Sequence, residues 1–324
     1  MRTVLVTAAF LAPEAVALLE GAGLAVACTS AYPDEAELLR GIAAHRPVAL
    51  LHRQGLVTAA VMDAALPELR VVARHGAGVD GIDLAAAAAR GLAVTRAAGA
   101  NSRSVAEHAM ALMLALLKDL PAIARGMADD RWEKTSRMTR DVEGLTLGLV
   151  GHGAIGARVA RLGAAFGMRV LAHDPLLPPG PLDGPAQRVA TLDSLLPQAE
   201  VLSLHCPLDA TTRGLLGARE LALLPAGAVL VHTARGGVAD EDALLAALDS
   251  GHLAGAGLDV FATEPLPPGH RLRTHPRVLA TPHIAANTPR GAVGMSTGAA
   301  ESIVAVLAGR EPALPGAVVL RAAA

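Results

Sequence analysis

The fold is decided by the stretch Gly144-Leu-Thr-Leu-Gly-Leu-Val-Gly-His-Gly-Ala-Ile-Gly156, together with Met168-Arg-Val-Leu-Ala-His-Asp-Pro175. The apolar run 145–150 has the length of a strand, and glycines 151, 153 and 156 follow it as G-x-G-x-x-G. Residues 157–167 carry apolar side chains at helical spacing, and a second apolar run ends at Asp174. The order strand, glycine turn, helix, strand and acid is typical of a dinucleotide-binding unit.

Each glycine has its own function in such a turn. Gly151 permits the tight turn, Gly153 lets the backbone approach a pyrophosphate, and Gly156 lets helix and strand pack closely. Asp174 lies 18 residues after Gly156, at the spacing of an acid that binds the adenosine ribose hydroxyls. Because a carboxylate there repels a 2′-phosphate, NAD is favoured over NADP as the cofactor. The alternative is a glycine turn in an ordinary βαβ unit, but the complete order of elements favours dinucleotide binding.

The composition limits the classes of partner. The 324 residues suffice for two domains, and 52% are hydrophobic, which allows a large core. The net charge is −2 without a basic run, so neither nucleic acid nor an anionic membrane is expected as a partner. No apolar run approaches the about 18 residues of a membrane span. The two cysteines, Cys28 and Cys206, fit the reducing cytoplasm, and the 12 histidines show no metal-ligand spacing.

Residues 1–98 predict a first α/β unit, since short apolar runs alternate with helical stretches. The predicted strands are 4–6, 25–28, 48–51, 71–73 and 93–95, and the predicted helices are 13–20, 34–45, 58–65 and 84–89. A long helix is expected over 102–120, with an apolar stripe from Val105 to Leu116 and with Pro121 ending or kinking it. The polar stretch 126–142, which holds Trp132, is expected at the surface or in an interface.

A second α/β unit is predicted from Leu145 to about Ala286, with further strands at 201–205, 228–232, 255–258 and 277–280. A last helix over 287–308 should return to the first unit. The predicted fold class is therefore α/β, with two Rossmann-like doubly wound parallel-sheet domains of which the first is discontinuous. Residues 1–98 and 287–324 would form the substrate domain, and 99–286 the NAD-binding domain.

Polar side chains follow three apolar strands of the second unit. Arg235, Glu264 and His283 are the candidates for catalysis. Arginine holds a carboxylate in two hydrogen bonds, and histidine transfers protons near neutral pH. A carboxylate beside the imidazole stabilises its charged form and fixes its tautomer. Taken alone, each could instead be a surface ion pair, a solvated acid or a satisfied loop histidine.

Two arginines flank turns at predicted strand ends of the first domain. Arg53 and Arg74 could hold a second anionic group of a substrate, such as a phosphate, a sulfonate or a distal carboxylate. The other interpretation is that both are solvated or make weak surface ion pairs.

Several motifs together resemble the D-isomer-specific 2-hydroxyacid dehydrogenases, over about 48–309. They are Arg74-His-Gly-Ala-Gly-Val-Asp-Gly-Ile-Asp83, Ser104-Val-Ala-Glu-His108, the glycine turn, His205-Cys-Pro-Leu-Asp-Ala-Thr-Thr212, Thr233-Ala-Arg-Gly-Gly237, Asp259-Val-Phe-Ala-Thr-Glu-Pro265 and Thr281-Pro-His283. The resemblance implies an NAD-dependent enzyme that interconverts 2-keto acids and D-2-hydroxy acids, and a homodimer paired through the cofactor domain. It also implies that Arg235 binds the substrate carboxylate, that His283 is the acid/base and that Glu264 tunes it.

The resemblance further implies a set of binding residues. Beyond the three motif glycines, the implied cofactor contacts are Ala154, Ile155, Asp174, Cys206, Pro207, Thr233, Ala234 and Asp259. Backbone groups of Gly76, Ala77 and Gly78 would line the substrate carboxylate.

The sequence departs from the family at places that concern the substrate. His232 stands where asparagine is frequent, His152 where leucine or phenylalanine is frequent, and His52-Arg53-Gln54-Gly55 where many relatives have Arg-Ser-x-Thr. Glu264 rather than glutamine counts against the related formate dehydrogenases. The chain is also expected to lack room for the regulatory domain of long phosphoglycerate dehydrogenases. A short-type phosphoglycerate dehydrogenase and a non-catalytic, corepressor-like NAD sensor remain as alternatives.

Overall fold

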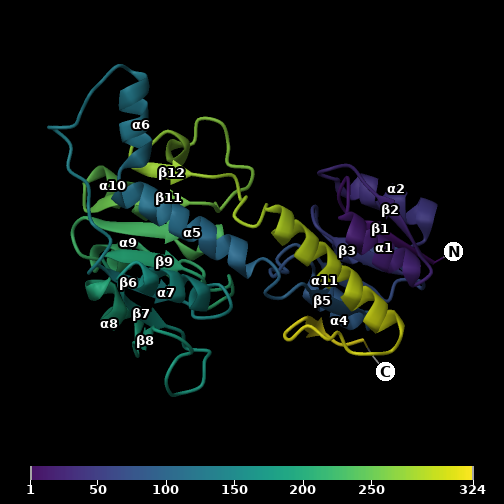
Figure 1. The fold of residues 1–324 in the computed structure, drawn as a ribbon. Helices are drawn as coiled ribbons and strands as arrows, with labels where there is room; N and C mark the ends of the chain where they lie inside the picture. Colours follow the sequence, from purple (N-terminus) through teal and green to yellow (C-terminus); the bar gives the residue numbers. More distant parts are fainter. Residues whose placement is uncertain (1, 323–324) are drawn as a thin grey trace. The chain divides into compact units, whose positions relative to one another are not determined.

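The computed structural model describes residues 2–322 and divides the chain into two units (Figure 1). Unit 1 comprises Met1–Asn101 and Asn287–Ala324, and unit 2 comprises Ser102–Ala286. The division falls at 101/102, close to the expected 98/99, and at 286/287. No helix within residues 2–322 has the length and apolar character needed to cross a membrane.

Unit 1 is built on a six-stranded sheet in the order β13-β5-β4-β3-β1-β2. Its strands are β1 (Arg2–Val6), β2 (Leu24–Cys28), β3 (Ala49–His52), β4 (Val71–Arg74), β5 (Ala93–Arg96) and β13 (Val318–Leu320). Its helices are α1 (Pro13–Gly21), α2 (Glu35–His45), α3 (Ala59–Ala65), α4 (Leu84–Ala89) and α11 (Pro289–Leu307). The last helix thus returns to unit 1, where it packs against α1 and β4. All strand pairs are parallel except β13 with β5, which was not predicted.

Unit 2 is built on a seven-stranded parallel sheet in the order β12-β11-β10-β9-β6-β7-β8. Its strands are β6 (Thr146–Val150), β7 (Arg169–His173), β8 (Gln187–Arg188), β9 (Val201–Leu204), β10 (Ala228–His232), β11 (Leu253–Leu258) and β12 (Val278–Ala280). Its α-helices are α5 (Ser102–Leu117), α6 (Leu120–Ala128), α7 (Gly156–Ala165), α8 (Leu192–Leu195), α9 (Ala218–Ala222) and α10 (Glu241–Asp249). Short 3₁₀ turns are η1 (Leu196–Gln198), η2 (Gly236–Val238) and η3 (Arg271–Arg273).

The prediction of two Rossmann-like parallel-sheet units is confirmed by these strand orders. In unit 2 the chain runs from β6 outward to β7 and β8, then crosses to β9 on the other side of β6. The order reverses there, and ligands of open α/β sheets bind at such a switch point, outside the carboxyl ends of the strands. The glycine turn after β6 lies at this position.

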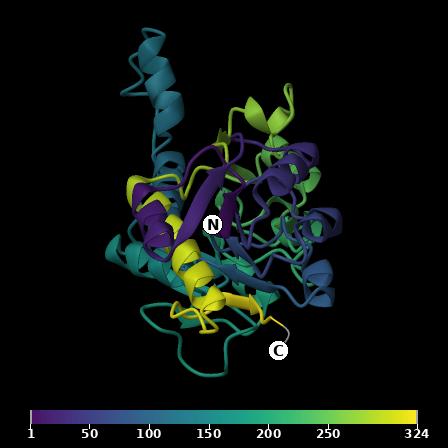
Figure 2. The same cartoon turned by 90° about the vertical axis from the view of Figure 1, so that its right-hand side faces the viewer.

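The predicted helix over 102–120 is wrong at its end. Helix α5 stops at Leu117, and Asp119 adopts a left-handed backbone with φ 49°. Pro121 does not break the helix; it lies in the first turn of α6, where a missing N–H costs nothing. Both views show α6 projecting from the rest of its unit (Figures 1 and 2).

The predicted apolar stripe of α5 is buried inside unit 2. Ala109, Leu112 and Met113 are buried, and α5 packs against β10 and β11. A Cβ atom on Gly257 of β11 would lie 2.9 Å from the Cβ of Leu112, so this glycine permits the close approach of the helix. The stripe therefore forms core rather than surface.

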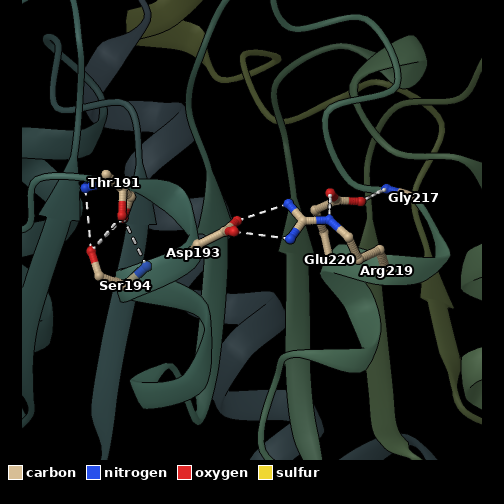
Figure 3. A network of polar contacts seen from close by, with 6 residues as sticks. All are labelled: Thr191, Asp193, Ser194, Gly217, Arg219 and Glu220. Carbon is tan, nitrogen blue, oxygen red and sulfur yellow. Dashed lines mark hydrogen bonds and ion pairs between the residues drawn. The ribbon is translucent and has the colours of Figure 1, made fainter.

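A polar network fixes two short helices of unit 2 (Figure 3). Thr191 and Ser194 form a capping box at α8, and the side chain of Glu220 accepts the N–H of Gly217 before α9. The guanidinium of Arg219 on α9 bonds both oxygens of Asp193 on α8, at 2.8 and 2.9 Å. Such a two-bond pair joins the helices in one geometry.

Candidate active site

The glycine turn after β6 has a separate steric reason for each glycine. Gly151 has φ +94°, and a Cβ atom there would lie 2.8 Å from the backbone of His205 and Cys206. A Cβ atom on Gly156 would lie 2.2 Å from the carbonyl oxygen of Gly151, whereas one on Gly153 would meet no atom within 4 Å. The first and third glycines therefore close the turn, and the second leaves open space above the backbone.

Helix α7 begins at this turn without a side-chain cap. Its N-cap residue is Ile155, which makes no side-chain hydrogen bond to the first turn. The first N–H groups of a helix lack intrahelical partners and favour an anion. The turn, with the exposed Ala154 before the helix, has the shape and polarity that a diphosphate needs.

The carboxylate of Asp174, directly after β7, is anchored to this turn. Its Oδ2 accepts the N–H of His152 at 2.8 Å, and its Oδ1 accepts the N–H of Leu176 at 3.0 Å. Each carboxylate oxygen keeps a further lone pair, so ribose hydroxyls could still donate to it. Arg188 of β8 donates to the carbonyl of Pro178 at 2.9 Å and holds the loop that follows Asp174.

Buried polar atoms lie at the neighbouring strand ends. Thr233 follows β10, and its buried Oγ1 has no hydrogen-bond partner among residues 2–322. A buried hydroxyl without a partner costs about 1–3 kcal/mol, which a bound ligand would offset. Cys206 and Pro207 follow β9, and burial raises the pKa of the Cys206 thiol to about 11, so the thiol stays neutral. The open turn, the anchored carboxylate and the orphaned hydroxyl together fit NAD.

His283 and Glu264 form a hydrogen-bonded pair. Nδ1 of His283, after β12, lies 2.6 Å from Oε2 of Glu264, after β11. Oε1 of Glu264 accepts the N–H of Phe261 at 2.9 Å. Burial raises the pKa of Glu264, but the His283 hydrogen bond and charge, the Phe261 amide and the Arg235 charge outweigh it, so that the pKa is lowered. The carboxylate is therefore ionised at neutral pH and accepts the Nδ1–H of His283.

Arg235 completes the set of three predicted catalytic residues in unit 2. It lies between β10 and η2, and its Nη1 donates to the carbonyl of the buried Ala234 at 2.7 Å. The next residue, Gly236, packs so tightly that a Cβ atom there would lie 1.9 Å from the carbonyl carbon of Phe261. The loop of Arg235 therefore lies against the loop that carries Glu264, and the Arg235 charge acts on that carboxylate.

Asp259 has a bonding pattern that its predicted cofactor contact did not suggest. The residue is 1% exposed, and its Oδ1 accepts the Oγ1–H of Thr281 at 2.6 Å and the N–H of Ile284 at 2.9 Å. Its Oδ2 accepts the N–H of Ala285 at 2.9 Å. Asp259 thus holds the segment that carries His283. No local sequence signal marks these contacts, because the partners are more than 20 positions away.

His232, which replaces a frequent asparagine, is buried at the end of β10. Both of its ring nitrogens are shielded from solvent. Burial lowers the pKa of His232 to about 4, with the Arg235 charge acting in the same direction. The imidazole is therefore neutral at pH 7. Across residues 2–322, no group of three or more His, Cys, Asp or Glu side chains could hold a metal ion.

The predicted substrate residues lie in unit 1: Arg53 follows β3, Arg74 is the last residue of β4, and Gly76, Ala77 and Gly78 follow it. Nη1 of Arg74 donates to the carbonyl of Arg53 at 2.6 Å, and the Arg53 guanidinium lies 5.2 Å from the centre of the Phe10 ring. The end of β4 is thus joined to the loop that carries Arg53. Arg53 makes no ion pair with any carboxylate among residues 2–322.

The glycine segment after β4 is anchored to helix α11 through the residue that precedes it. Gly76 has φ +122°, a region that favours glycine, and Ala77 and Gly78 follow it in the segment. The preceding His75 is buried, and its Nε2 lies 3.1 Å from Oγ of Ser296 on α11. The hydrogen bond between His75 and Ser296 therefore fixes the position of the segment's backbone N–H groups.

Comparisons with known proteins agree with this geometry. The family model described as "D-isomer specific 2-hydroxyacid dehydrogenase, NAD binding domain" matches residues 110–285. A Mycobacterium bovis protein named D-3-phosphoglycerate dehydrogenase is 39% identical over 277 residues, which are 86% of this chain and 52% of that protein. The chain thus spans about half the length of the curated relatives it matches.

Solved structures match over nearly the whole chain. The TT0316 protein of Thermus thermophilus is 40% identical with a TM-score of 0.88, covering 98% of this chain and 100% of that chain. A glyoxylate reductase from Paecilomyes thermophila is 27% identical with a TM-score of 0.84, covering 99% of this chain and 98% of that chain.

Proposed function

Because this chain belongs to the D-isomer specific 2-hydroxyacid dehydrogenase family, we propose that it interconverts a 2-keto acid and the corresponding D-2-hydroxy acid, with NAD as the cofactor. The observation that carries the proposal is the 2.6 Å hydrogen bond between His283 and Glu264. The carboxylate orients the imidazole, which can then donate a proton to the substrate. The planar guanidinium of Arg235 can bind the substrate carboxylate.

The protein's own groups have distinct functions in the proposed reaction. Glu264 holds Nδ1–H of His283, which leaves Nε2 to exchange a proton with the substrate. In reduction, protonated His283 donates from Nε2 to the keto oxygen, and in oxidation neutral His283 removes the hydroxyl proton. Arg235 binds the substrate carboxylate in two hydrogen bonds and fixes its orientation. When bound, NAD supplies or accepts the hydride.

The cofactor would be held by residues of unit 2. The glycine turn would bind the diphosphate through Gly151, Gly153, Ala154, Ile155 and Gly156. Asp174 would bind the ribose. The remaining proposed cofactor contacts are Cys206, Pro207, Thr233, Ala234 and Asp259. The orphaned hydroxyl of Thr233 and the open space at Gly153 support this assignment.

Arg53 and Arg74 would bind a second anionic group of the substrate, while the backbone of Gly76, Ala77 and Gly78 would line its carboxylate. The hydrogen bond that joins Arg74 at the end of β4 to the loop of Arg53 supports a doubly anionic substrate. Several relatives are named D-3-phosphoglycerate dehydrogenase, so the oxidation of a phosphorylated hydroxy acid is the second candidate.

A homodimer is the proposed assembly. Its support comes from the segment 120–138 rather than from the buried stripe of α5. Leu120 is 53% exposed, Met127 51%, Trp132 77% and Met138 95%. An exposed apolar surface of this kind favours a protein contact. Light scattering should give twice the chain mass at micromolar concentration, and a monomer would exclude the dimer. A cytoplasmic location is proposed from the two free cysteines.

Turnover tests the proposed activity directly. A panel of 2-keto acids, with and without a second phosphate, sulfonate or carboxylate group, is mixed with NADH, and loss of NADH absorbance is followed. The activity predicts turnover of at least one member and a D-configured product. A corepressor-like sensor would bind NADH without turning over any of them.

A further inference from the structure

Three polar side chains form a hydrogen-bonded row in unit 2. Nε2 of His108 on α5 lies 3.0 Å from Oγ1 of Thr281, and that Oγ1 lies 2.6 Å from Oδ1 of Asp259. The row connects a core helix with the ends of β11 and β12. Neither His108 nor Thr281 takes part in the proposed proton transfer or cofactor binding.

The direction of the hydrogen bonds follows from the donors available. Thr281 has one hydroxyl proton, and it donates that proton to Oδ1 of Asp259. The oxygen of Thr281 must then accept from His108, which requires a proton on Nε2 of the imidazole. Nε2 of His108 also lies 3.6 Å from Oδ1 of Asp259, so its N–H is directed at the same buried acid.

The far end of the row holds the backbone around His283. Asp259 accepts the N–H groups of Ile284 and Ala285, the two residues that follow His283, each at 2.9 Å. His283 has φ +53°, a conformation that costs a non-glycine residue about 1–3 kcal/mol and persists only when the surrounding structure holds it. The buried Asp259 contributes to this restraint through its bonds to the next two N–H groups, beside the bond from the His283 N–H to the Thr281 carbonyl.

We propose that His108 is a positioning residue for His283. By donating to Thr281 it fixes the hydroxyl that, together with Asp259, sets the backbone on which the imidazole is carried. His108 contacts no reacting atom, so its effect is transmitted through Thr281 and Asp259. The inference rests on the proposed function of His283 in proton transfer. Since a misplacement of about 1 Å can cost about 100-fold in rate, a looser segment would lower kcat.

The test compares three variants of the full chain. His108→Leu removes the donor, and His108→Gln keeps an N–H near the position of Nε2. Glu107→Ala changes the exposed neighbour on α5, whose ion pair is with Arg103, and serves as the matched control. For each variant, kcat, KM and NADH affinity are measured, and hydrogen exchange is followed at the amides of Ile284 and Ala285.

His108→Leu should lower kcat by about 10- to 100-fold, leave KM and NADH affinity within about twofold, and speed exchange at both amides. His108→Gln should restore most of kcat and slow exchange, and Glu107→Ala should match the parent. Should His108→Leu fail to fold, Thr281→Val with Thr281→Ser as its hydroxyl-bearing control tests the same row.

Unchanged exchange at Ile284 and Ala285 in His108→Leu would overturn the proposal. Faster amide exchange in His108→Leu without a loss of kcat would overturn it as well. So would a loss of kcat in His108→Leu that His108→Gln does not restore. Parental kcat in His283→Ala would overturn the proposed proton transfer instead, and the exchange data would still decide whether His108 holds the segment.

Discussion

His283 and Glu264 are 19 positions apart in the sequence, yet Nδ1 of the first lies 2.6 Å from Oε2 of the second. The contact exists because β11 and β12 are neighbours in the sheet and both loops leave it at the same edge. Their side chains are 46% and 34% exposed, so a substrate could reach the pair.

Replacement of His283 should abolish proton transfer and leave cofactor binding intact. In His283→Ala we expect kcat to fall by about 10²- to 10⁴-fold, because a positioned acid/base acts chiefly in the transition state. NADH affinity, followed by fluorescence, should stay near the parental value. Near-parental kcat on a good substrate would show that His283 is not the acid/base.

Glu264→Gln should change the pH dependence more than the maximal rate. Because the pKa of Glu264 is lowered, its carboxylate stays charged below the pH range in which a glutamate usually titrates, and it is protonated only at more acid pH. In the variant the His283 imidazolium lacks this negative neighbour, so keto-acid reduction should lose activity at lower pH than in the parent. The measurement is kcat/KM against pH, and superimposable profiles would contradict the prediction.

Asp174 should set the preference for NADH. Its carboxylate repels a 2′-phosphate, so the parent should use NADH with at least about tenfold higher kcat/KM than NADPH. Asp174→Asn keeps an oxygen that can accept from the His152 N–H and removes the charge, so it should narrow this ratio. Equal kcat/KM for NADH and NADPH in the parent would show that Asp174 does not select the cofactor.

Arg53 and Arg74 should discriminate between substrates by charge. Arg53→Ala and Arg74→Ala should raise KM about tenfold or more for substrates with a second anionic group, since a hydrogen bond to a charged group contributes about 1.5–3 kcal/mol. KM for monoanionic keto acids should change less. If neither variant alters KM for any active substrate, the arginines have no part in binding.

Buried histidines should make the fold sensitive to acid. Burial lowers the pKa of His75 and His232 to about 4, with smaller effects from nearby arginines, whereas an unfolded chain has the ordinary value of 6.5. The unfolded state therefore binds more protons below that value, and stability should fall as the pH drops from 6.5 toward 4.

Each such histidine should contribute a slope of up to about 1.4 kcal/mol per pH unit. His232→Asn should remove one of them, which urea titrations between about pH 7 and about pH 5 would detect as a shallower loss of stability. The same pH dependence in the parent and the variant would contradict the prediction.

Much of the architecture could be predicted because it depends on local patterns. Apolar runs at strand spacing, helical stripes and the glycine spacing after Val150 each report burial or backbone geometry within a few residues. The three candidates for catalysis could also be selected from the sequence, since Arg235, Glu264 and His283 each lie a few residues after a strand.

What the sequence could not predict depends on distant contacts or on unusual backbone. Asp119 ends α5 in a left-handed conformation without a glycine to signal it, so Pro121 was the more obvious break. Strand β13 is three residues long, which is too short for a periodic pattern, and its pairing with the distant β5 makes it a strand. The bonds of Asp259 to the His283 segment join residues on different loops, which no spacing rule reports.

The close approach of Gly236 to the Phe261 carbonyl has a consequence for how this protein can vary. Even a single methyl group at 236 would overlap the main chain of the neighbouring loop, so every other amino acid should be rejected there. In a saturation library, position 236 should show depletion as complete as at Arg235 itself, although it carries no reactive group. The loop of Arg235 can therefore move only if the loop of Glu264 moves with it.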